Sequence, residues 1–306
     1  MTTSPSTGPG AIPLAATVIL ARDSDRGPQV LMTKRAAGLS FMAGLWVFPG
    51  GRVEAADASR DLVGDDAART TLAEIGARMC DADGRPLDAG QTLSILAAAC
   101  RETFEESGLV LARRRADGSP PGRAQWLRME MARAPTLDAA AFAALMRDEG
   151  LVLDVGRLVY WSHWITPALE GKRFDTRFFA VEAPADQVAS VDQSELTHHA
   201  WLDESDVRRG LESGEMKIAP PTQATLQDLW TSHGRHGSVS TMLAAERGRR
   251  VPPILPRARP GADGHLELVL PWDPEYASIR GDLWQWSGPY PDHLLALPSR
   301  RPARRR

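Results

Sequence analysis

The stretch that decides the fold lies at residues 101–109. It reads Arg101-Glu102-Thr103-Phe104-Glu105-Glu106-Ser107-Gly108-Leu109. With the residues before it, this stretch shows helical spacing from Thr92 to Ser107, because apolar and charged positions separate onto two faces at about 100° per residue. Gly108 follows the expected end of the helix, where a residue able to adopt positive φ is favoured. The sequence therefore predicts an amphipathic helix that ends at a glycine.

Three glutamates, Glu102, Glu105 and Glu106, share one face of this predicted helix. The opposite face is an apolar stripe, which comprises Leu93, Ala97, Cys100 and Phe104. Like charges at this spacing repel one another by roughly a few tenths of a kcal/mol per pair, and a bound divalent cation would offset the repulsion. Hard cations such as Mg²⁺ take carboxylate oxygens, waters and phosphate oxygens as ligands. The glutamates taken alone leave open the alternative of a solvated acidic face.

A resemblance to a known family rests on this stretch and on a second one upstream. The upstream stretch reads Phe48-Pro49-Gly50-Gly51-Arg52-Val53-Glu54-Ala55-Ala56-Asp57. Together the two are similar to the Nudix signature, G-x5-E-x7-R-E-U-x-E-E-x-G-U, in which U is an apolar residue. Asp57 stands where the family has glutamate, and Thr103 stands at an apolar position. Between Asp57 and Arg101 lie 43 residues instead of seven, so residues 58–92 are expected to leave the signature as an insertion and return to it.

The resemblance implies that residues of the signature bind a divalent metal ion, Mg²⁺ or Mn²⁺. Gly51 would contribute its backbone, and Glu102, Glu105 and Glu106 would contribute their carboxylates. Glu102 is also the first candidate for the group that deprotonates the attacking water, and Glu195, in a later loop, is the second. The alternative for Glu195 is an ordinary acidic residue on a surface loop.

The other signature residues are expected to have structural roles: Gly50, Asp57, Arg101 and Gly108. Arg101 would brace the glycine turn through an ion pair with Asp57, since a guanidinium and a carboxylate form paired, charge-assisted hydrogen bonds. In this role Arg101 would fix the geometry of the site and would take no direct part in the chemistry.

Four basic residues outside the signature are candidates for binding the phosphates of a substrate: Lys34, Arg35, Arg173 and Arg177. Lys34 and Arg35 end a predicted strand that leads to the glycine turn. Arg173 and Arg177 share one face of another predicted strand, because alternate residues of a strand point to the same side. For both pairs, exposure to solvent without contact to substrate is an equal alternative.

The order of the predicted strands and helices indicates the fold class. Strand patterns occur at residues 15–20, 29–34, 45–48, 158–165 and 173–181, and helical patterns at 67–80, 92–107, 137–148, 204–213 and 222–230. The two kinds do not alternate strictly, which favours a mixed β-sheet between helices over a doubly wound parallel sheet. We therefore expect an α+β protein, an α/β/α sandwich similar to the Nudix fold.

Composition divides the chain into three parts. Residues 1–10 are rich in Ser, Thr, Gly and Pro and are expected to be a disordered tail. Residues 11–235 carry the signature and most of the strand patterns and are expected to form a Nudix hydrolase domain. Residues 236–306 are a Pro/Trp-rich extension, since the last 56 residues hold 10 of the 23 prolines. Trp272, Trp284 and Trp286 suggest that this extension docks, either onto the main body or onto a second copy in a homodimer.

Overall composition limits the classes of function. With 306 residues, 43% of them apolar and 25% charged, the chain is typical of globular proteins. A formal net charge of −3 argues against nucleic acid or an anionic membrane as the main partner. Two cysteines are too few for a disulfide framework. The first residues lack a basic signal segment and the apolar run at 12–21 is too short to span a bilayer, so the cytoplasm is the expected location.

Further stretches resemble the acyl-coenzyme A diphosphatase branch of the Nudix family. They are Trp46-Val47-Phe48-Pro49-Gly50-Gly51, Trp164-Ile165-Thr166-Pro167 and Leu270-Pro271-Trp272-Asp273-Pro274-Glu275-Tyr276. That branch cleaves coenzyme A or its acyl esters to 3′,5′-ADP and 4′-phosphopantetheine or its acyl form. ADP-ribose, nucleotide sugars and dinucleoside polyphosphates are alternative substrates, since loops decide among leaving groups. A non-catalytic Nudix module that binds a nucleotide is a further alternative, which the three intact glutamates disfavour.

Overall fold

The computed structural model describes residues 12–38, 42–81, 84–133, 137–168, 170–191, 196–260, 266–280, 289–295 and 301–302. Several predictions fall outside these residues. They are the disordered tail at residues 1–10, the candidate base Glu195, and the docking tryptophans Trp284 and Trp286.

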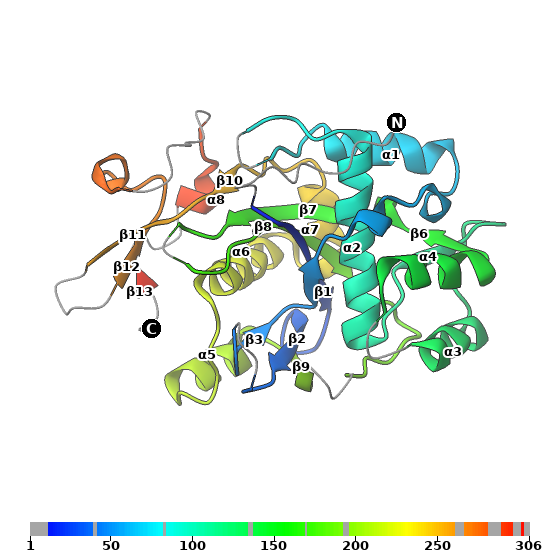
Figure 1. The fold of residues 1–306 in the computed structure, drawn as a ribbon. Helices are drawn as coiled ribbons and strands as arrows, with labels where there is room; N and C mark the ends of the chain where they lie inside the picture. The colour runs from blue at the N-terminus through cyan, green and yellow to red at the C-terminus, as the bar shows by residue number, and fades with distance from the viewer. Residues whose placement is uncertain are drawn as a thin grey trace.

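A mixed β-sheet of eight strands forms the centre of the molecule (Figure 1). Six strands follow the order β10-β7-β8-β1-β2-β3, while β4 pairs with β1 and β9 with β2. The strands are β1 (Leu14–Arg22), β2 (Gln29–Arg35), β3 (Trp46–Val47), β4 (Gly50–Arg52), β7 (Val159–Ile165), β8 (Asp175–Glu182), β9 (Leu196–Leu202) and β10 (Pro253–Ile254). β1 runs parallel to β8 and β10 parallel to β7, whereas the other pairs are antiparallel. The expected mixed sheet is confirmed.

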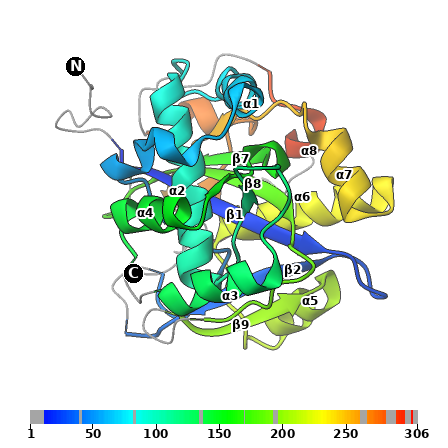
Figure 2. The ribbon, with the colours of Figure 1, turned by 90° about the vertical axis from the view of Figure 1, so that its right-hand side faces the viewer.

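Helices cover this sheet on both sides (Figures 1 and 2). They are α1 (Asp66–Gly76), α2 (Ala89–Ser107), α3 (Arg123–Ala132), α4 (Ala139–Asp148), α5 (Glu204–Glu212), α6 (Pro220–His236), α7 (Val239–Glu246) and α8 (Asp292–Leu295), with single turns η1 (Ala55–Ala58), η2 (Arg60–Leu62), η3 (Val155–Arg157) and η4 (Tyr276–Ser278). Two smaller sheets complete the fold; one joins β5 (Ala112–Arg114) to β6 (Leu151–Leu153), and the other joins β11 (Arg257–Pro260), β12 (Leu266–Val269) and β13 (Arg301–Pro302).

Two apolar layers, one on each face of the sheet, make the sandwich. Along β1, Ala16, Val18 and Leu20 belong to the layer that contains α1, α2 and α4, whereas Ile19 and Ala21 belong to the layer that contains α6 and α7. A strand in the middle of such a sheet must be apolar on both faces, since successive side chains point to opposite sides. Figure 2 shows α2 and α7 on opposite sides of the strands. The predicted α/β/α class is therefore confirmed.

Helix α2 is longer and more deeply enclosed than its sequence pattern indicates. It begins after Asp88, whose side chain accepts from the backbone N–H of Gln91, and it ends at Gly108 with a φ of 69°. The insertion covers its first half, because Leu72 and Ile75 of α1 pack in the same apolar layer. Residues 92–101 are all buried, the three glutamates near the end of α2 are half-buried, and only Ala89 and Gly90 at its start are exposed.

Helix α3 has no counterpart among the predicted elements. Its buried side chains are Trp126 and Met129, and two buried positions make too short a stripe to show helical periodicity. The C-terminal extension also contributes more regular structure than expected. Its α7 packs against α6 and β8, and its β10 joins the central sheet beside β7.

The extension docks onto the main body of the same chain. Trp272 packs against Tyr290 with ring centroids 5.2 Å apart, and both lie against the apolar layer of α6 and α7. This is one of the two docking arrangements that its tryptophans suggested. In the parts of the chain that the structure describes, no helix is both long and apolar enough to cross a membrane.

Candidate active site

The glycine turn and the end of α2 meet at the edge of β1. Gly50 and Gly51 belong to β4, and the backbone N–H of Gly50 donates to Oε2 of Glu106 at 2.9 Å. A Cβ atom on Gly51 would lie 2.5 Å from the carboxylate of Glu102. A Cβ atom on Gly50 would lie equally close to the carbonyl oxygen of Ala16, at 2.5 Å. At Gly50 the obstacle is backbone, so only glycine fits, whereas at Gly51 a side chain would displace the carboxylate of Glu102 from the turn.

A buried guanidinium braces this turn. Arg101 donates to Asp57 twice, from Nε to Oδ1 at 3.0 Å and from Nη2 to Oδ2 at 3.2 Å. Nη2 also donates to the carbonyl oxygen of Arg52 at 3.0 Å, and Nη1 donates to Oε1 of Glu102 at 2.9 Å. The predicted ion pair is therefore present. Because Asp57 and Arg101 flank the insertion, the same pair brings the two halves of the signature together.

Burial dominates the ionisation of the acids at this site. It raises the pKa of Glu102 to about 7, with Arg101 opposing this shift and the charge of Glu105 adding to it. Burial, together with the charge of Glu102, also raises the pKa of Glu106 well above its usual range, although the N–H of Gly50 favours the charged form. Both acids therefore resist ionisation in this environment, and a cation beside them would favour their charged forms.

The donors at this site fit a hard divalent cation that keeps part of its water shell. Glu102, Glu105 and Glu106 line one cavity beside the backbone of Gly51. The side chains of Glu102 and Glu105 are 15% and 21% exposed, so solvent and substrate can reach them. Within the described residues, no group of three or more acidic, His or Cys side chains is placed so that it could hold a metal ion on its own. Mg²⁺ needs none, because it takes one or two carboxylates and completes its shell with waters and phosphate oxygens.

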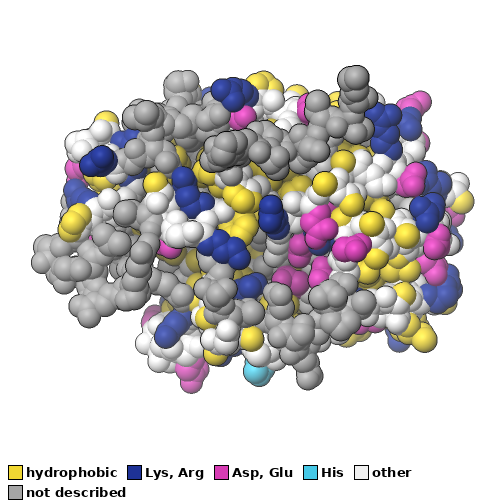
Figure 3. Space-filling view, in the orientation of Figure 1, with side chains coloured by type: hydrophobic (Ala, Val, Ile, Leu, Met, Phe, Trp, Pro, Cys, Tyr) yellow, Lys and Arg dark blue, Asp and Glu magenta, His cyan; other side chains and the backbone are white. Residues whose placement is uncertain are grey.

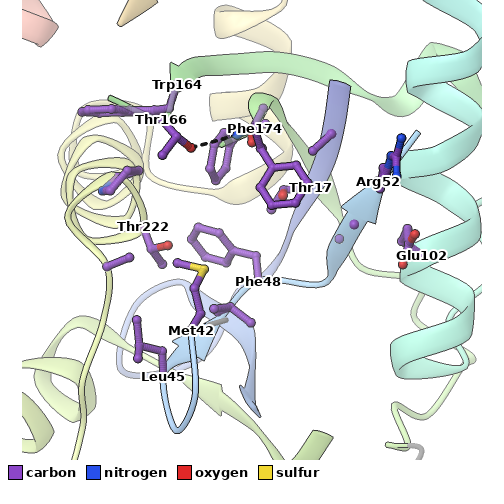
Figure 4. Close-up of a pocket in the computed structure, with 18 of the residues that line it drawn as sticks. Thr17, Met42, Leu45, Phe48, Arg52, Glu102, Trp164, Thr166, Phe174 and Thr222 are labelled. Atoms are coloured by element: carbon purple, nitrogen blue, oxygen red, sulfur yellow. Dashed lines mark hydrogen bonds between the residues drawn. The ribbon is translucent and has the colours of Figure 1, made fainter. Parts of the chain in front are cut away.

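The cavity has a volume of about 920 Å³ and two chemically different ends. Its acidic end is lined by Glu54, Glu102, Glu105, Glu106 and Asp138, together with Arg35, Arg52 and Arg101. The rest of the cavity is mainly apolar, with Lys172 over the ring of Phe174 and with Glu170 also in the lining; its apolar residues are Met42, Leu45, Phe48, Trp164, Phe174, Phe178, Ala219, Pro220, Pro221 and Leu268. In the space-filling view, acidic side chains gather at one side of a hollow whose floor is apolar (Figure 3). Phe48, Phe174 and Trp164 surround the apolar end, and Glu102 lies beyond Arg52 at the other (Figure 4).

The structure separates the two basic residues predicted at the end of β2. Arg35 lines the cavity, and its charge favours the ionised form of Glu106. Lys34 does not line it; this side chain borders a smaller depression beside Asp206 and Arg209, in and near α5. The two neighbours point to opposite sides of the strand, as successive residues of a strand must.

The prediction that Arg177 binds substrate is wrong. Its side chain is fully buried, where it pairs with Asp175 and donates to the carbonyl oxygen of Cys80 in the insertion. Arg173 donates from Nε to the carbonyl oxygen of Thr166 at 2.9 Å and does not line the cavity. Thr176 and Phe178 of this strand, with Phe174 just before it, line the cavity instead. The strand was predicted correctly, but its two faces were assigned the wrong way round.

Sequence reasoning missed the aromatic end of the cavity. Phe48 and Phe178 pack edge to face with ring centroids 6.3 Å apart, although they lie far apart in the sequence. Trp164 and Leu268 come from two further segments. The sequence pattern could have indicated only Phe174 and Phe178. They alternate with Arg173 and Arg177 in the same predicted strand and therefore lie on its other face.

Comparison with known proteins finds a family model and named relatives that match this chain. The model of the family described as NUDT19 Nudix domain matches residues 12–229. A relative from Gallus gallus, the acyl-coenzyme A diphosphatase NUDT19, is 30% identical over 308 residues, covering 86% of this chain and 80% of its own. The protein of the same name from Homo sapiens is 29% identical over 261 residues, covering 72% and 69%.

Solved structures show the same fold. The crystal structure of a Nudix hydrolase from Alicyclobacillus acidocaldarius superimposes with a TM-score of 0.55 at 24% identity, over 78% of this chain and 97% of that one. This likeness concerns the fold alone. The match of the family model to most of the chain goes further, and it shows that the protein is a Nudix hydrolase of the NUDT19 Nudix domain family.

Proposed function

We propose that the protein hydrolyses the diphosphate linkage of coenzyme A or of an acyl-coenzyme A, giving 3′,5′-ADP and 4′-phosphopantetheine or its acyl form. The observation that carries the proposal is the cavity, in which an acidic end leads directly into an apolar end. Relatives named acyl-coenzyme A diphosphatase support the same substrate class. Acyl-coenzyme A has a matching shape, with a charged diphosphate in the middle and a long, largely apolar arm on one side.

The acidic end is the proposed place of reaction. Glu102, Glu105, Glu106 and the backbone of Gly51 would hold Mg²⁺ or Mn²⁺ there. When bound, such an ion neutralises diphosphate charge and lowers the pKa of an attacking water. Glu102 is our first candidate for the group that accepts the proton of that water, and Glu195 is the second.

Arginine side chains at the acidic end of the cavity would attract an anionic substrate. Arg35 and Arg52 line the cavity beside the acids, so their charges can attract the diphosphate. Arg101 holds the glycine turn and leaves the approach to the acids open. Arg35 and Arg52 would bind and orient the diphosphate.

The apolar end would take the pantetheine or acyl arm. Pockets for such groups are lined mainly by apolar and aromatic side chains, with few polar groups to fix orientation. Phe48, Phe178 and Trp164 provide this lining, and Leu268 adds a wall from the C-terminal extension. We therefore propose that residues 11–235 form the hydrolase domain and that the extension, residues 236–306, completes its substrate cavity.

A panel of diphosphates tests the proposal. The protein would be incubated with Mg²⁺ or Mn²⁺ and with coenzyme A, acyl-coenzyme A of several chain lengths, ADP-ribose, a nucleotide sugar and a dinucleoside polyphosphate. We expect 3′,5′-ADP from the coenzyme A compounds at the highest kcat/KM, identified by chromatography and mass spectrometry. A higher kcat/KM for ADP-ribose would overturn the substrate assignment, and inactivity on the whole panel would favour a binding module.

Location and assembly are further parts of the proposal. We propose that the protein acts in the cytoplasm on a small-molecule substrate, with no role for nucleic acid or a membrane. Cell fractionation tests the location. Light scattering of the purified protein tests whether it forms a homodimer.

A further inference from the structure

The last turn of α2 must keep Glu105 and Glu106 in place beside the glycine turn. A helix end leaves its final carbonyl groups without donors from the helix itself. At the end of α2, several of these carbonyl groups accept hydrogen bonds from elsewhere in the chain. The donors come from two segments, α3 with the residue after it and the loop that precedes β9.

Arg133, the residue after α3, provides a charged donor. Its Nη1 donates to the carbonyl oxygen of Glu105 at 3.2 Å and to that of Phe104 at 3.5 Å. A positive charge at the C-terminus of a helix is favourable, because the helix dipole is negative there. The side chain of Arg133 is only 10% exposed, so little of this interaction is lost to solvent.

Glu130 and Ser190 hold the guanidinium in this orientation. Nη2 of Arg133 donates to Oε1 of Glu130 at 2.8 Å, and Oγ of Ser190 donates to the same oxygen at 2.7 Å. Ser190 lies in the loop before β9. At the end of α2, hydrogen bonds therefore link α3 and the residue after it to the loop before β9.

Two further hydrogen bonds complete the arrangement. Nε1 of Trp126 donates to the carbonyl oxygen of Gly108 at 2.9 Å, and the backbone N–H of Ser190 donates to that of Ser107 at 2.9 Å. At Gly108 a Cβ atom would lie 2.3 Å from Oε2 of Glu130. The last turn of α2 is therefore enclosed on several sides and has little freedom to shift.

We propose that Arg133 is a positioning residue for the metal site: by binding the last carbonyl groups of α2, it fixes Glu105 and Glu106 relative to the glycine turn. This inference rests on the metal-binding role proposed for those two glutamates. Arg133 does not line the cavity, so its effect on metal binding or turnover acts through the helix. Groups that orient metal ligands typically change affinity or activity by about 10- to 100-fold when they are removed.

The test compares Arg133→Gln with a matched change on α3, the helix that precedes it, Arg128→Gln. Arg128 is 58% exposed and pairs with Glu149, away from the end of α2. Mn²⁺ affinity would be measured without substrate by electron paramagnetic resonance. The kcat and KM for coenzyme A and the amide hydrogen exchange of residues 104–109 would be measured on the same samples.

For Arg133→Gln we expect Mn²⁺ affinity to fall about tenfold and kcat to fall about 10- to 100-fold, with KM within twofold. Exchange at residues 104–109 should become faster. Arg133→Lys keeps the charge but loses the forked geometry, so it should recover part of the affinity. Arg128→Gln should behave as the unchanged protein.

A loss of thermal stability alone, with Mn²⁺ affinity and kcat within twofold, would overturn the proposal. If Arg133→Gln does not fold, Arg133→Lys decides the question. A loss of Mn²⁺ affinity relative to the unchanged protein supports the positioning role, and an unchanged affinity overturns it. Absence of Mn²⁺ binding by the unchanged protein would instead refute the proposed metal site. The hydrogen-exchange data would then test only whether Arg133 stabilises the end of α2. Unchanged exchange at residues 104–109 in Arg133→Gln would overturn that as well.

Discussion

Arg101 and Arg177 are both buried and each pairs with an aspartate, yet their surroundings differ. Arg101 has four carboxylates within 4 Å of its guanidinium, those of Glu54, Asp57, Glu102 and Glu105. Arg177 pairs with Asp175, which also binds His163, in a cluster that is sealed from solvent. An excess of negative charge beside an open cavity is a costly arrangement that a substrate-bound cation can relieve, whereas a closed and balanced cluster serves the fold.

Both clusters hold the insertion to the main body. Arg101 joins its two ends through Asp57, and Arg177 binds the carbonyl oxygen of Cys80 within it. The comparison therefore teaches that similar pairs can serve one architectural purpose while only one of them, Arg101 with Asp57, adjoins the proposed metal site. The four predictions below test that difference, in order of decreasing effect.

The largest effect is expected at the acids beside Arg101. Glu106→Gln keeps the size of the side chain but removes a charge from the proposed metal site. We expect kcat to fall at least about a thousandfold, on the order of 4 kcal/mol, while the thermal midpoint stays nearly unchanged. Steady-state kinetics and calorimetry measure the two quantities. Near-normal turnover would show that Glu106 is no metal ligand.

The sealed cluster should respond in the opposite way. Arg177→Met leaves the buried carboxylate of Asp175 without its guanidinium, which typically costs about 3 kcal/mol of unfolding free energy or more. We expect kcat per folded molecule to stay within twofold, because Arg177 does not line the cavity. Urea denaturation and kinetics on the same preparation measure both. A large loss of kcat at full stability would place Arg177 in the reaction after all.

The sealed cluster should also make stability depend on pH. Burial and the charge of Arg177 lower the pKa of His163, although Asp175 opposes the shift. The unfolded chain therefore takes up a proton at about pH 6.5 while the folded chain does not. This contribution to stability is complete above that pH and is lost on acidification, by up to about 1.4 kcal/mol per pH unit.

Urea denaturation between pH 7.5 and 5 checks this dependence. His163→Asn should make stability fall less on acidification than in the unchanged protein, whereas the exposed His198→Asn should leave the slope unchanged. If both variants keep the slope of the unchanged protein, the acid sensitivity arises elsewhere.

The smallest effect is expected at the apolar end of the cavity. Arg101 lines this cavity and Arg177 does not. Leu268→Ala removes part of a wall that the extension provides. We expect kcat/KM for a long-chain acyl-coenzyme A to fall about fivefold, near 1 kcal/mol, with free coenzyme A unaffected. Leu127→Ala, exposed on α3, is the control. An equal loss for both substrates would remove Leu268 from chain-length selection.

Much of the architecture was predictable because it depends on local patterns. The strands from 15–20 and 173–181 and the helix from 92–107 follow from alternation and helical spacing, and the structure contains all three. Helix α3 was missed, since two buried residues carry no periodic signal. Its role at the end of α2 is also invisible in the sequence, because Trp126 and Arg133 bind backbone groups far along the chain.

The sequence by itself determined the acid-bearing helix, the glycine turn and the family, because these depend on residue types at short, fixed spacings. Only the tertiary structure decided that Asp57 meets Arg101 across the insertion and that Phe178, rather than Arg177, faces the cavity. The physical reason is that such contacts depend on how distant segments pack. The face of a strand is set by its pairing register, and a shift of one residue exchanges the two faces.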